Sequence, residues 1–394
     1  MRTTTTFVLV SLGTLGDLDP LLALGVELRA RGGRVVVGVA ENLCKRVREA
    51  DFEATAIAGD LSGMTANPLA GIMEIRRSMT RQLAALERLS EDAAIVLGSG
   101  FPIGAPTIAE LRRIPYLYVA VSPSYLPEAG LLPYIGAPAP GWVCRLGWAY
   151  QGFSNNAMFA PGLNSFRAAK EMAKTGPVFR AVFQPERRMV AAPKEVAGEA
   201  GLFAPGFLRM PATGECPAEV ARFLESGEPP VVIAFGSSRI AKARELTLSL
   251  VEAARACGRR TLLASSWSDS EIGELPADIC RAPYVPYSRL FERAALAIHH
   301  GGAGTFALAL AAGIPQATLP GFADQSFWAR KACELGVSPS PIPRKSATSE
   351  KTLAMVREAL TNPAYARRAA EVAAGPIAEN GVSRAADWVE EALR

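Results

Sequence analysis

HHGGAGT, at residues 299–305, follows a short apolar run that begins at Leu296 and precedes a helix-forming segment. Its three glycines let a ligand approach the backbone closely, because glycine has no side chain. The first N–H groups of a helix lack partners within the helix, and the helix dipole favours an anion beside them. His300 and Thr305 add side-chain donors, and both histidines of the chain lie here. This stretch predicts a pyrophosphate site; a glycine-rich turn beside a buried histidine is the structural alternative.

Apolar runs alternate with helix-forming segments in both halves of the 394-residue chain. The runs at 7–10, 35–39, 94–97, 116–121, 231–235, 261–264, 296–299 and 316–319 are typical of strands in a covered parallel sheet. A Pro- and Gly-rich segment separates the halves. We therefore expect an α/β fold of two facing Rossmann-like parallel-sheet domains with a central cleft. The expected boundaries are 1–205, a linker at 206–217, a second domain at 218–375, and a C-terminal segment at 376–394.

The composition excludes several classes of protein. A net charge of +4 is too small for a typical nucleic-acid binder, and no stretch is long and apolar enough to suggest a membrane span. The six cysteines are scattered, without the spacing of a zinc site or a disulfide framework. We expect a cytoplasmic monomer or homodimer, with at most peripheral membrane association and no bound metal.

HHGGAGT resembles the donor-site signature of GT-B glycosyltransferases, a family that includes macrolide, glycopeptide, sterol and rhamnolipid enzymes. The resemblance extends over most of the chain. SLGTLGD at 11–17 is similar to the family's N-terminal loop, and FGSS at 235–238 is similar to its second phosphate loop. Asp324-Gln325 matches an acidic–Gln pair that holds sugar hydroxyls. The resemblance implies a nucleotide-diphosphate sugar as co-substrate, no other cofactor, and a last helix that crosses back to the first domain.

The same resemblance assigns the donor-binding residues. In the family, the positions of His300 and Thr305 contact the phosphates, and the stretch around Val285 holds the base through its backbone. The donor-binding set is therefore expected to comprise Ser237, Ser238, Val285, His300, Gly302, Ala303, Gly304, Thr305, Asp324 and Gln325.

The turn after the first strand contains two acids, Asp17 and Asp19. Asp19 precedes Pro20, so we expect Asp19 to cap a helix that Pro20 opens. Asp17 has no such role and resembles the aspartate that one subgroup of the family uses in place of a histidine. A carboxylate there can take the acceptor proton, so Asp17 is the predicted general base; a hydrogen bond that stabilises the loop is the alternative. Asp17-Leu18-Asp19 also reads as a metal-binding DxD motif, which the capping role of Asp19 disfavours.

Residues 125–163 are rich in proline and aromatic residues. This composition suits an apolar acceptor pocket, with Tyr125, Tyr134 and Trp142 as expected contacts. Irregular loops and short helices packed on a core are an equally good interpretation.

Together these features predict an inverting transfer of a hexose or deoxyhexose, of glucose or rhamnose type, from a UDP- or TDP-sugar to a hydroxyl of a lipophilic acceptor. Two alternatives stay open. Gly13, Gly16 and Glu41 partly match the pattern of an NAD(P)-dependent reductase. A non-catalytic protein that kept the transferase fold is the other alternative.

Overall fold

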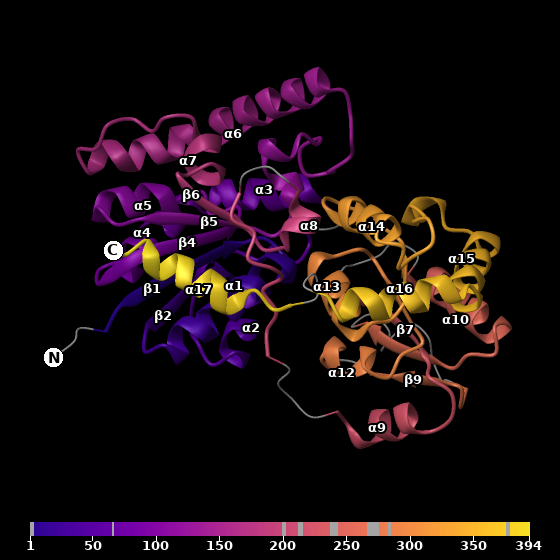
Figure 1. Cartoon of the computed structure of the whole chain (residues 1–394). Helices are drawn as coiled ribbons and strands as arrows, with labels where there is room; N and C mark the ends of the chain where they lie inside the picture. Colours follow the sequence, from indigo (N-terminus) through magenta and orange to yellow (C-terminus); the bar gives the residue numbers. More distant parts are fainter. Residues whose placement is uncertain are drawn as a thin grey trace. The chain divides into compact units, whose positions relative to one another are not determined.

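The computed structural model describes residues 4–64, 67–198, 202–211, 216–236, 243–265, 276–282, 285–375 and 379–394. The chain forms two compact units (Figure 1): unit 1 comprises Met1–Met210 and Asn380–Arg394, and unit 2 comprises Pro211–Glu379. Each unit is built on one parallel sheet, which confirms the predicted fold class. The division after Met210 lies within the segment predicted as a linker. The exact domain limits stay a prediction.

Unit 1 contains a six-stranded sheet in the order β3-β2-β1-β4-β5-β6. The strands are β1 (Thr6–Leu12), β2 (Arg34–Ala40), β3 (Glu53–Ala58), β4 (Ala93–Gly100), β5 (Tyr116–Ala120) and β6 (Arg187–Val190). The helices are α1 (Leu15–Ala30), α2 (Cys44–Glu49), α3 (Pro68–Arg77), α4 (Met79–Leu89), α5 (Ala105–Arg112), α6 (Gly141–Ala169), α7 (Val178–Phe183), α8 (Lys194–Ala197) and α17 (Val382–Glu391), with 3-10 turns η1 (Glu41–Leu43), η2 (Pro123–Tyr125) and η3 (Pro127–Ala129). Every residue of β1 is buried, because helices cover both faces of the sheet.

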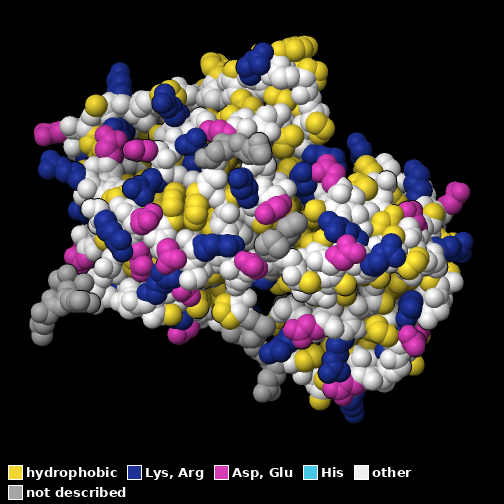
Figure 2. Space-filling model, viewed as in Figure 1, with side chains coloured by type: hydrophobic (Ala, Val, Ile, Leu, Met, Phe, Trp, Pro, Cys, Tyr) yellow, Lys and Arg dark blue, Asp and Glu magenta, His cyan; other side chains and the backbone are white. Residues whose placement is uncertain are grey.

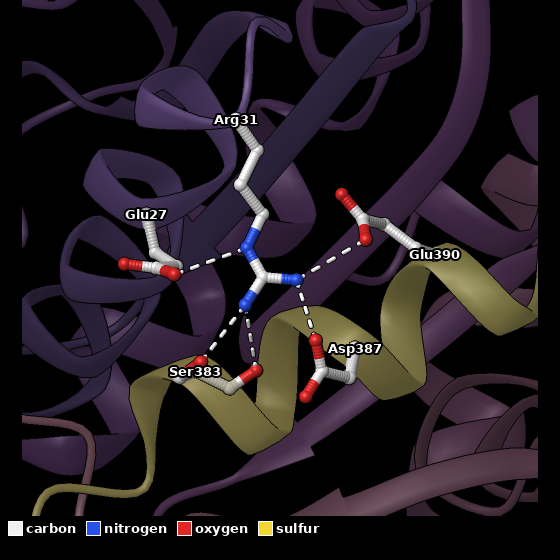
Figure 3. Close-up of polar contacts among 5 residues, drawn as sticks. All are labelled: Glu27, Arg31, Ser383, Asp387 and Glu390. Carbon is white, nitrogen blue, oxygen red and sulfur yellow. Dashed lines mark hydrogen bonds and ion pairs between the residues drawn. The ribbon is translucent and has the colours of Figure 1, made fainter.

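The C-terminal helix α17 packs on α1 within unit 1 (Figure 1). Val382, Ala385, Ala386 and Val389 join the apolar core of this unit. Arg31, directly after α1, binds α17 through Asp387 at 2.6 Å and Glu390 at 3.1 Å (Figure 3). The same guanidinium donates to the carbonyl and hydroxyl oxygens of Ser383 at 3.1 and 2.9 Å. The apolar contacts bury surface and so stabilise the packing of α17, and the hydrogen bonds of Arg31 fix the orientation of the helix.

Unit 2 contains a five-stranded sheet in the order β11-β10-β7-β8-β9. The strands are β7 (Val231–Gly236), β8 (Thr261–Ser265), β9 (Ile279–Arg281), β10 (Leu296–His299) and β11 (Gln316–Thr318). The described helices are α9 (Ala218–Glu225), α10 (Ala243–Ala256), α12 (Tyr287–Phe291), α13 (Ala303–Ala312), α14 (Gln325–Glu334), α15 (Ser349–Thr361) and α16 (Pro363–Ala373), with the 3-10 turn η4 (Arg344–Ser346). Two apolar clusters, one on each face of the sheet, form the core.

The strand orders show where the turn with Asp17 and the HHGGAGT turn lie in their sheets. Each sheet reverses its winding direction at one point, between β1 and β4 in unit 1 and between β7 and β10 in unit 2. Ligands of open α/β sheets bind beyond the carboxyl ends of the strands at such a point. β1 leads into the turn with Asp17, and β10 leads into HHGGAGT. No helix in the described ranges is long and apolar enough to cross a membrane.

Candidate functional site

Asp17 lies in the first turn of α1, three residues after the N-cap residue Thr14. Its Oδ2 accepts the backbone N–H of Thr14 at 2.8 Å and the Thr14 hydroxyl at 3.0 Å. The helix therefore begins at Leu15, and the prediction that Pro20 opens it is wrong. The reciprocal contacts of Thr14 and Asp17 start the helix earlier, and Pro20 lies inside it.

The roles expected of the two acids are thus corrected. Asp19 does not cap the helix; its Oδ1 accepts a hydrogen bond from Arg46 Nε at 2.8 Å. Asp17, expected to have no capping role, completes the capping box. The two carboxylates bind different partners, so the structure gives no support to a shared DxD metal site. In the described part of the chain, no three His, Cys, Asp or Glu side chains lie close enough to hold a metal ion.

Glycines shape the surroundings of Asp17. A side chain on Gly13 would begin 2.3 Å from Asp17 Oδ2, so only glycine leaves room for the carboxylate. Gly100, at the end of β4, has a φ of +69°, and a side chain there would meet the Leu12 carbonyl oxygen at 2.5 Å. Asp17 is only 6% exposed, and burial raises its pKa while the Thr14 hydrogen bonds partly oppose that rise. A carboxyl with a raised pKa is a stronger base once it is ionised.

HHGGAGT connects β10 to α13 in unit 2. The Nδ1 of the buried His299 accepts the Gly301 N–H at 3.1 Å, so its Nε2 carries the proton and donates to Gln316 Oε1 at 2.9 Å. Gly301 has a φ of +83°, and a side chain there would begin 2.6 Å from the Gln325 carbonyl oxygen. His299 is therefore a buried residue that stabilises the glycine-rich turn, which is the structural alternative to a pyrophosphate-binding role.

The start of α13 is open. Gly302 is the N-cap residue and makes no side-chain hydrogen bond to the helix, so the N–H groups of Ala303, Gly304 and Thr305 have no cap. A side chain on Gly304 would meet nothing within 4 Å, which shows open space above this turn among the described residues. Ala303 and Thr305 are buried beside it. This geometry can bind an anion through backbone N–H groups and the helix dipole.

His300 sits beside this helix start. A side chain on Gly302 would begin 2.5 Å from His300 Nε2, so the glycine makes room for the imidazole. Burial lowers the pKa of His300 to about 3, and the nearby Arg344 contributes to that shift. In the free chain His300 is therefore neutral at neutral pH. An anion bound beside it would raise its pKa again.

Asp324 and Gln325 lie where α14 begins. Gln325 Oε1 accepts the N–H groups of Gly321 at 2.9 Å and Phe322 at 3.1 Å. Asp324 Oδ2 accepts the indole N–H of Trp328 at 2.9 Å. Gln325 reaches the HHGGAGT turn through its carbonyl, which closely approaches Gly301. The pair and the turn therefore belong to one region of unit 2. Hydrogen bonds within the unit already use Asp324 Oδ2 and Gln325 Oε1, so fewer polar atoms are left for a sugar than the motif suggests.

Arg344 is a cation of this region that the sequence did not indicate. Its guanidinium passes Gly321, where a side chain would begin 2.0 Å from Nη2. Its Nη1 is buried and has no hydrogen-bond partner in the structure as described. Residue 344 lies some 40 positions after the turn, in η4, so no local motif marks it. The Arg344 N–H holds it in place through a bond to the Pro320 carbonyl at 2.9 Å.

The remaining predicted residues lie in three settings. Ser237 and Ser238 fall outside the described residues. The side chain of Val285 is buried in the core of unit 2. Tyr125 and Tyr134 pack edge to face with ring centroids 5.5 Å apart.

The aromatic cluster around Tyr134 continues with Trp148, at a centroid distance of 6.3 Å, and with Phe101, at 5.7 Å. Trp142 lies apart from these ring contacts, exposed on α6. Helix α6 is 29 residues long, so loops and short helices are the wrong description of its part of 125–163. Pro161 lies inside the helix and does not end it.

Known proteins share these features. Residues 7–130 match the glycosyltransferase family 28 N-terminal domain, and residues 260–390 match the C-terminal domain of erythromycin biosynthesis protein CIII-like proteins. The chain is 30% identical to O-mycaminosyltylonolide 6-deoxyallosyltransferase of Streptomyces fradiae, over 97% of this chain and 96% of the relative. It is also 30% identical to vancomycin aglycone glucosyltransferase of Amycolatopsis orientalis, over 98% and 97%.

A solved structure, the glycotransferase of kitacinnamycin, has the same fold, with a TM-score of 0.75 and 20% identity over the full length of both chains. The matching relatives across nearly the whole chain favour transfer chemistry over the reductase that Gly13, Gly16 and Glu41 suggested. The chain belongs to the GT-B nucleotide-sugar glycosyltransferases that include the enzymes of macrolide and glycopeptide biosynthesis, and it is a glycosyltransferase.

Proposed function

We propose that the protein transfers a hexose or deoxyhexose from a UDP- or TDP-sugar to a hydroxyl of a lipophilic or aromatic acceptor, with inversion at the anomeric carbon. The observation that carries this proposal is the open start of α13, where a glycine N-cap leaves three N–H groups for the donor diphosphate. The glucosyl and 6-deoxyallosyl transferases among the relatives support both sugar classes.

The donor side uses fixed positive groups. We propose that the N–H groups of Ala303, Gly304 and Thr305 meet the diphosphate and that His300, which lies beside Gly302, binds it from the side. Arg344 is our addition to the predicted set, because its buried Nη1, which has no hydrogen-bond partner among the described residues, gains one when an anion binds. These groups neutralise the leaving diphosphate, so we propose that no bound metal is needed. Asp324 and Gln325 are proposed to hold the sugar.

The acceptor side uses Asp17. Both Thr14 hydrogen bonds go to Oδ2, which leaves Oδ1 to accept the proton of the acceptor hydroxyl. The acceptor oxygen forms a bond to the anomeric carbon as the bond from that carbon to the diphosphate oxygen breaks, and the proton moves to Asp17. The aromatic cluster of Tyr125 and Tyr134 is the proposed apolar contact. We place this reaction in the cytoplasm.

Calorimetry in EDTA tests the donor site with UDP, TDP, ADP and NADPH as ligands. We expect UDP or TDP to bind and NADPH not to bind. Arg344→Gln should weaken binding of the nucleotide diphosphate by about tenfold, or about 1.4 kcal/mol. Lys345→Gln, at the exposed neighbouring position, should leave this affinity unchanged. Binding of NADPH alone, or a requirement for added magnesium, would contradict the proposal; equal effects of the two variants would remove only Arg344.

A further inference from the structure

The outer face of α6 is apolar although it is exposed. Trp142, Leu146, Tyr150 and Phe153 are 65%, 63%, 69% and 72% exposed. At 100° per residue their spacing of four, four and three keeps them within an arc of about 80° on one helix face. Hydrophobic side chains gather along the outer edge of unit 1 above α6 in Figure 2. We call these four side chains the α6 stripe.

The other face of the same helix packs inward. Cys144, Trp148, Asn155 and Phe159 are buried in unit 1. The α6 stripe is therefore not needed to attach α6 to its own unit. In the described part of the chain only six large hydrophobic side chains are exposed, and four of them form the stripe. Contiguous apolar surface of this kind marks a site of interaction.

The charge around α6 identifies the kind of partner. From Ala129 to Lys170 the sequence contains no Asp or Glu. Arg145 lies beside the stripe and is exposed. At the C-terminal end of α6, Glu110 pairs with Arg167 at 2.7 Å and Glu87 with Lys170 at 2.6 Å, and Glu74 of α3 accepts the Gly59 N–H at 3.2 Å. Arg145 thus places positive charge beside the stripe on a helix whose own sequence contains no acid, which suits an anionic surface.

Positive charge also lies on two helices that pack on α6, where Met79 of α4 meets Gly162, nine residues beyond the stripe. α3 and α4 both contact α6, and they carry the exposed Arg76, Arg77 and Arg81. A second copy of this helix face would supply no acid for Arg145 and would add a like charge. Trp, Tyr, Phe and Leu beside Arg is the composition of helices that lie in the headgroup region of a bilayer. We propose that the α6 stripe docks the protein on an anionic lipid surface.

This docking is separate from the transfer reaction. It would hold unit 1 at the lipid surface, where a lipophilic acceptor would reside. It requires neither Asp17 nor the HHGGAGT turn. The inference therefore stands whether or not the proposed acceptor class is correct.

Sedimentation of the full-length protein with vesicles tests the proposal. We expect binding to phosphatidylcholine vesicles that contain phosphatidylglycerol and much weaker binding to phosphatidylcholine alone. Tyr150→Asp with Phe153→Asp should weaken binding at least about tenfold, and Arg145→Gln should reduce only the part that depends on phosphatidylglycerol. Ala366→Asp, which adds an acid to the exposed face of α16, is the control and should bind as the wild type does.

Melting curves and affinity for the nucleotide diphosphate show that the variants are folded, and both should match the wild type. Failure of the wild type to bind either vesicle would overturn the proposal. A concentration-dependent dimer that the double variant abolishes, without vesicle binding, would assign the stripe to a second copy. Loss of acceptor affinity without vesicle binding would assign it to the acceptor site. Either result would also reject the lipid surface.

Discussion

The turn at Leu12–Asp17 in unit 1 and the turn at His299–Thr305 in unit 2 both leave a strand beside the switch point of a parallel sheet and enter a helix. In the first turn the N-cap is Thr14, and an acid stands three residues later. In the second the N-cap is Gly302, and the residue three positions later is Thr305. The same architecture thus carries opposite electrostatic character.

In the reaction that we propose, this difference separates the base from the diphosphate site. The Asp17 carboxylate satisfies the N–H of Thr14, so the first helix start already has its negative charge. Among the described residues the second helix start has no such charge, so it can take one from a ligand. The N-cap residue and the residue three positions later thus give the two turns their different charge preferences.

Removing the base should have the largest effect. Asp17→Asn keeps an oxygen for Thr14 but cannot take a proton, so kcat should fall by roughly 10² to 10⁴ with donor affinity unchanged. Burial raises the pKa of Asp17 above its unfolded value, so the ionised form costs stability at neutral pH, and the variant should melt no lower than the wild type. Turnover at saturating substrates and a melting curve measure both. Asp19→Asn, which loses part of its pairing with Arg46, is the matched control and should keep most of its turnover.

Normal turnover by Asp17→Asn would show that the base lies elsewhere. A large drop in melting temperature would show that the carboxylate mainly stabilises the turn. In either case the contrast between the two turns would lose its catalytic meaning.

Giving the second turn the charge of the first should have the next largest effect. Thr305→Asp places an acid at the third residue of α13, as in α1, so it should stabilise the helix start yet repel a diphosphate. We expect affinity for the nucleotide diphosphate to fall by about 10- to 100-fold, or about 1.4 to 2.8 kcal/mol. Thr305→Val, which removes only the hydroxyl, should lose less. Calorimetry with the nucleotide diphosphate measures these affinities. Equal affinities for Thr305→Asp and the wild type would place the diphosphate away from α13.

The smallest effect is expected at Thr14. Thr14→Val removes the hydroxyl bond to Asp17 Oδ2 but keeps the backbone one. Because that bond lowers the pKa of Asp17, its loss should raise the pKa and move the acid limb of the kcat profile to higher pH. Thr14→Ser should restore the wild-type profile. A profile that stays in place in Thr14→Val, with only the melting temperature reduced, would limit Thr14 to capping.

The sequence alone determined the alternation of strands and helices, because buried parallel strands must be continuous apolar runs and the segments between them must return the chain. It also determined that HHGGAGT starts a helix, since glycines and two donors lie together in seven residues. This turn is local, so its position could be predicted from neighbours in the chain.

Tertiary structure alone decided the rest. The partner of Asp19 was decided by Arg46, a residue 27 positions away whose Nε donates to Asp19 Oδ1. Arg344 reached the donor region from η4 because Gly321 admits its side chain. Helix α6 has two apolar faces, and the packing of unit 1 decided which face is buried and which is exposed. Each outcome rests on contacts between distant segments, and an apolar pattern or a lone charge does not specify its partner until the chain has folded.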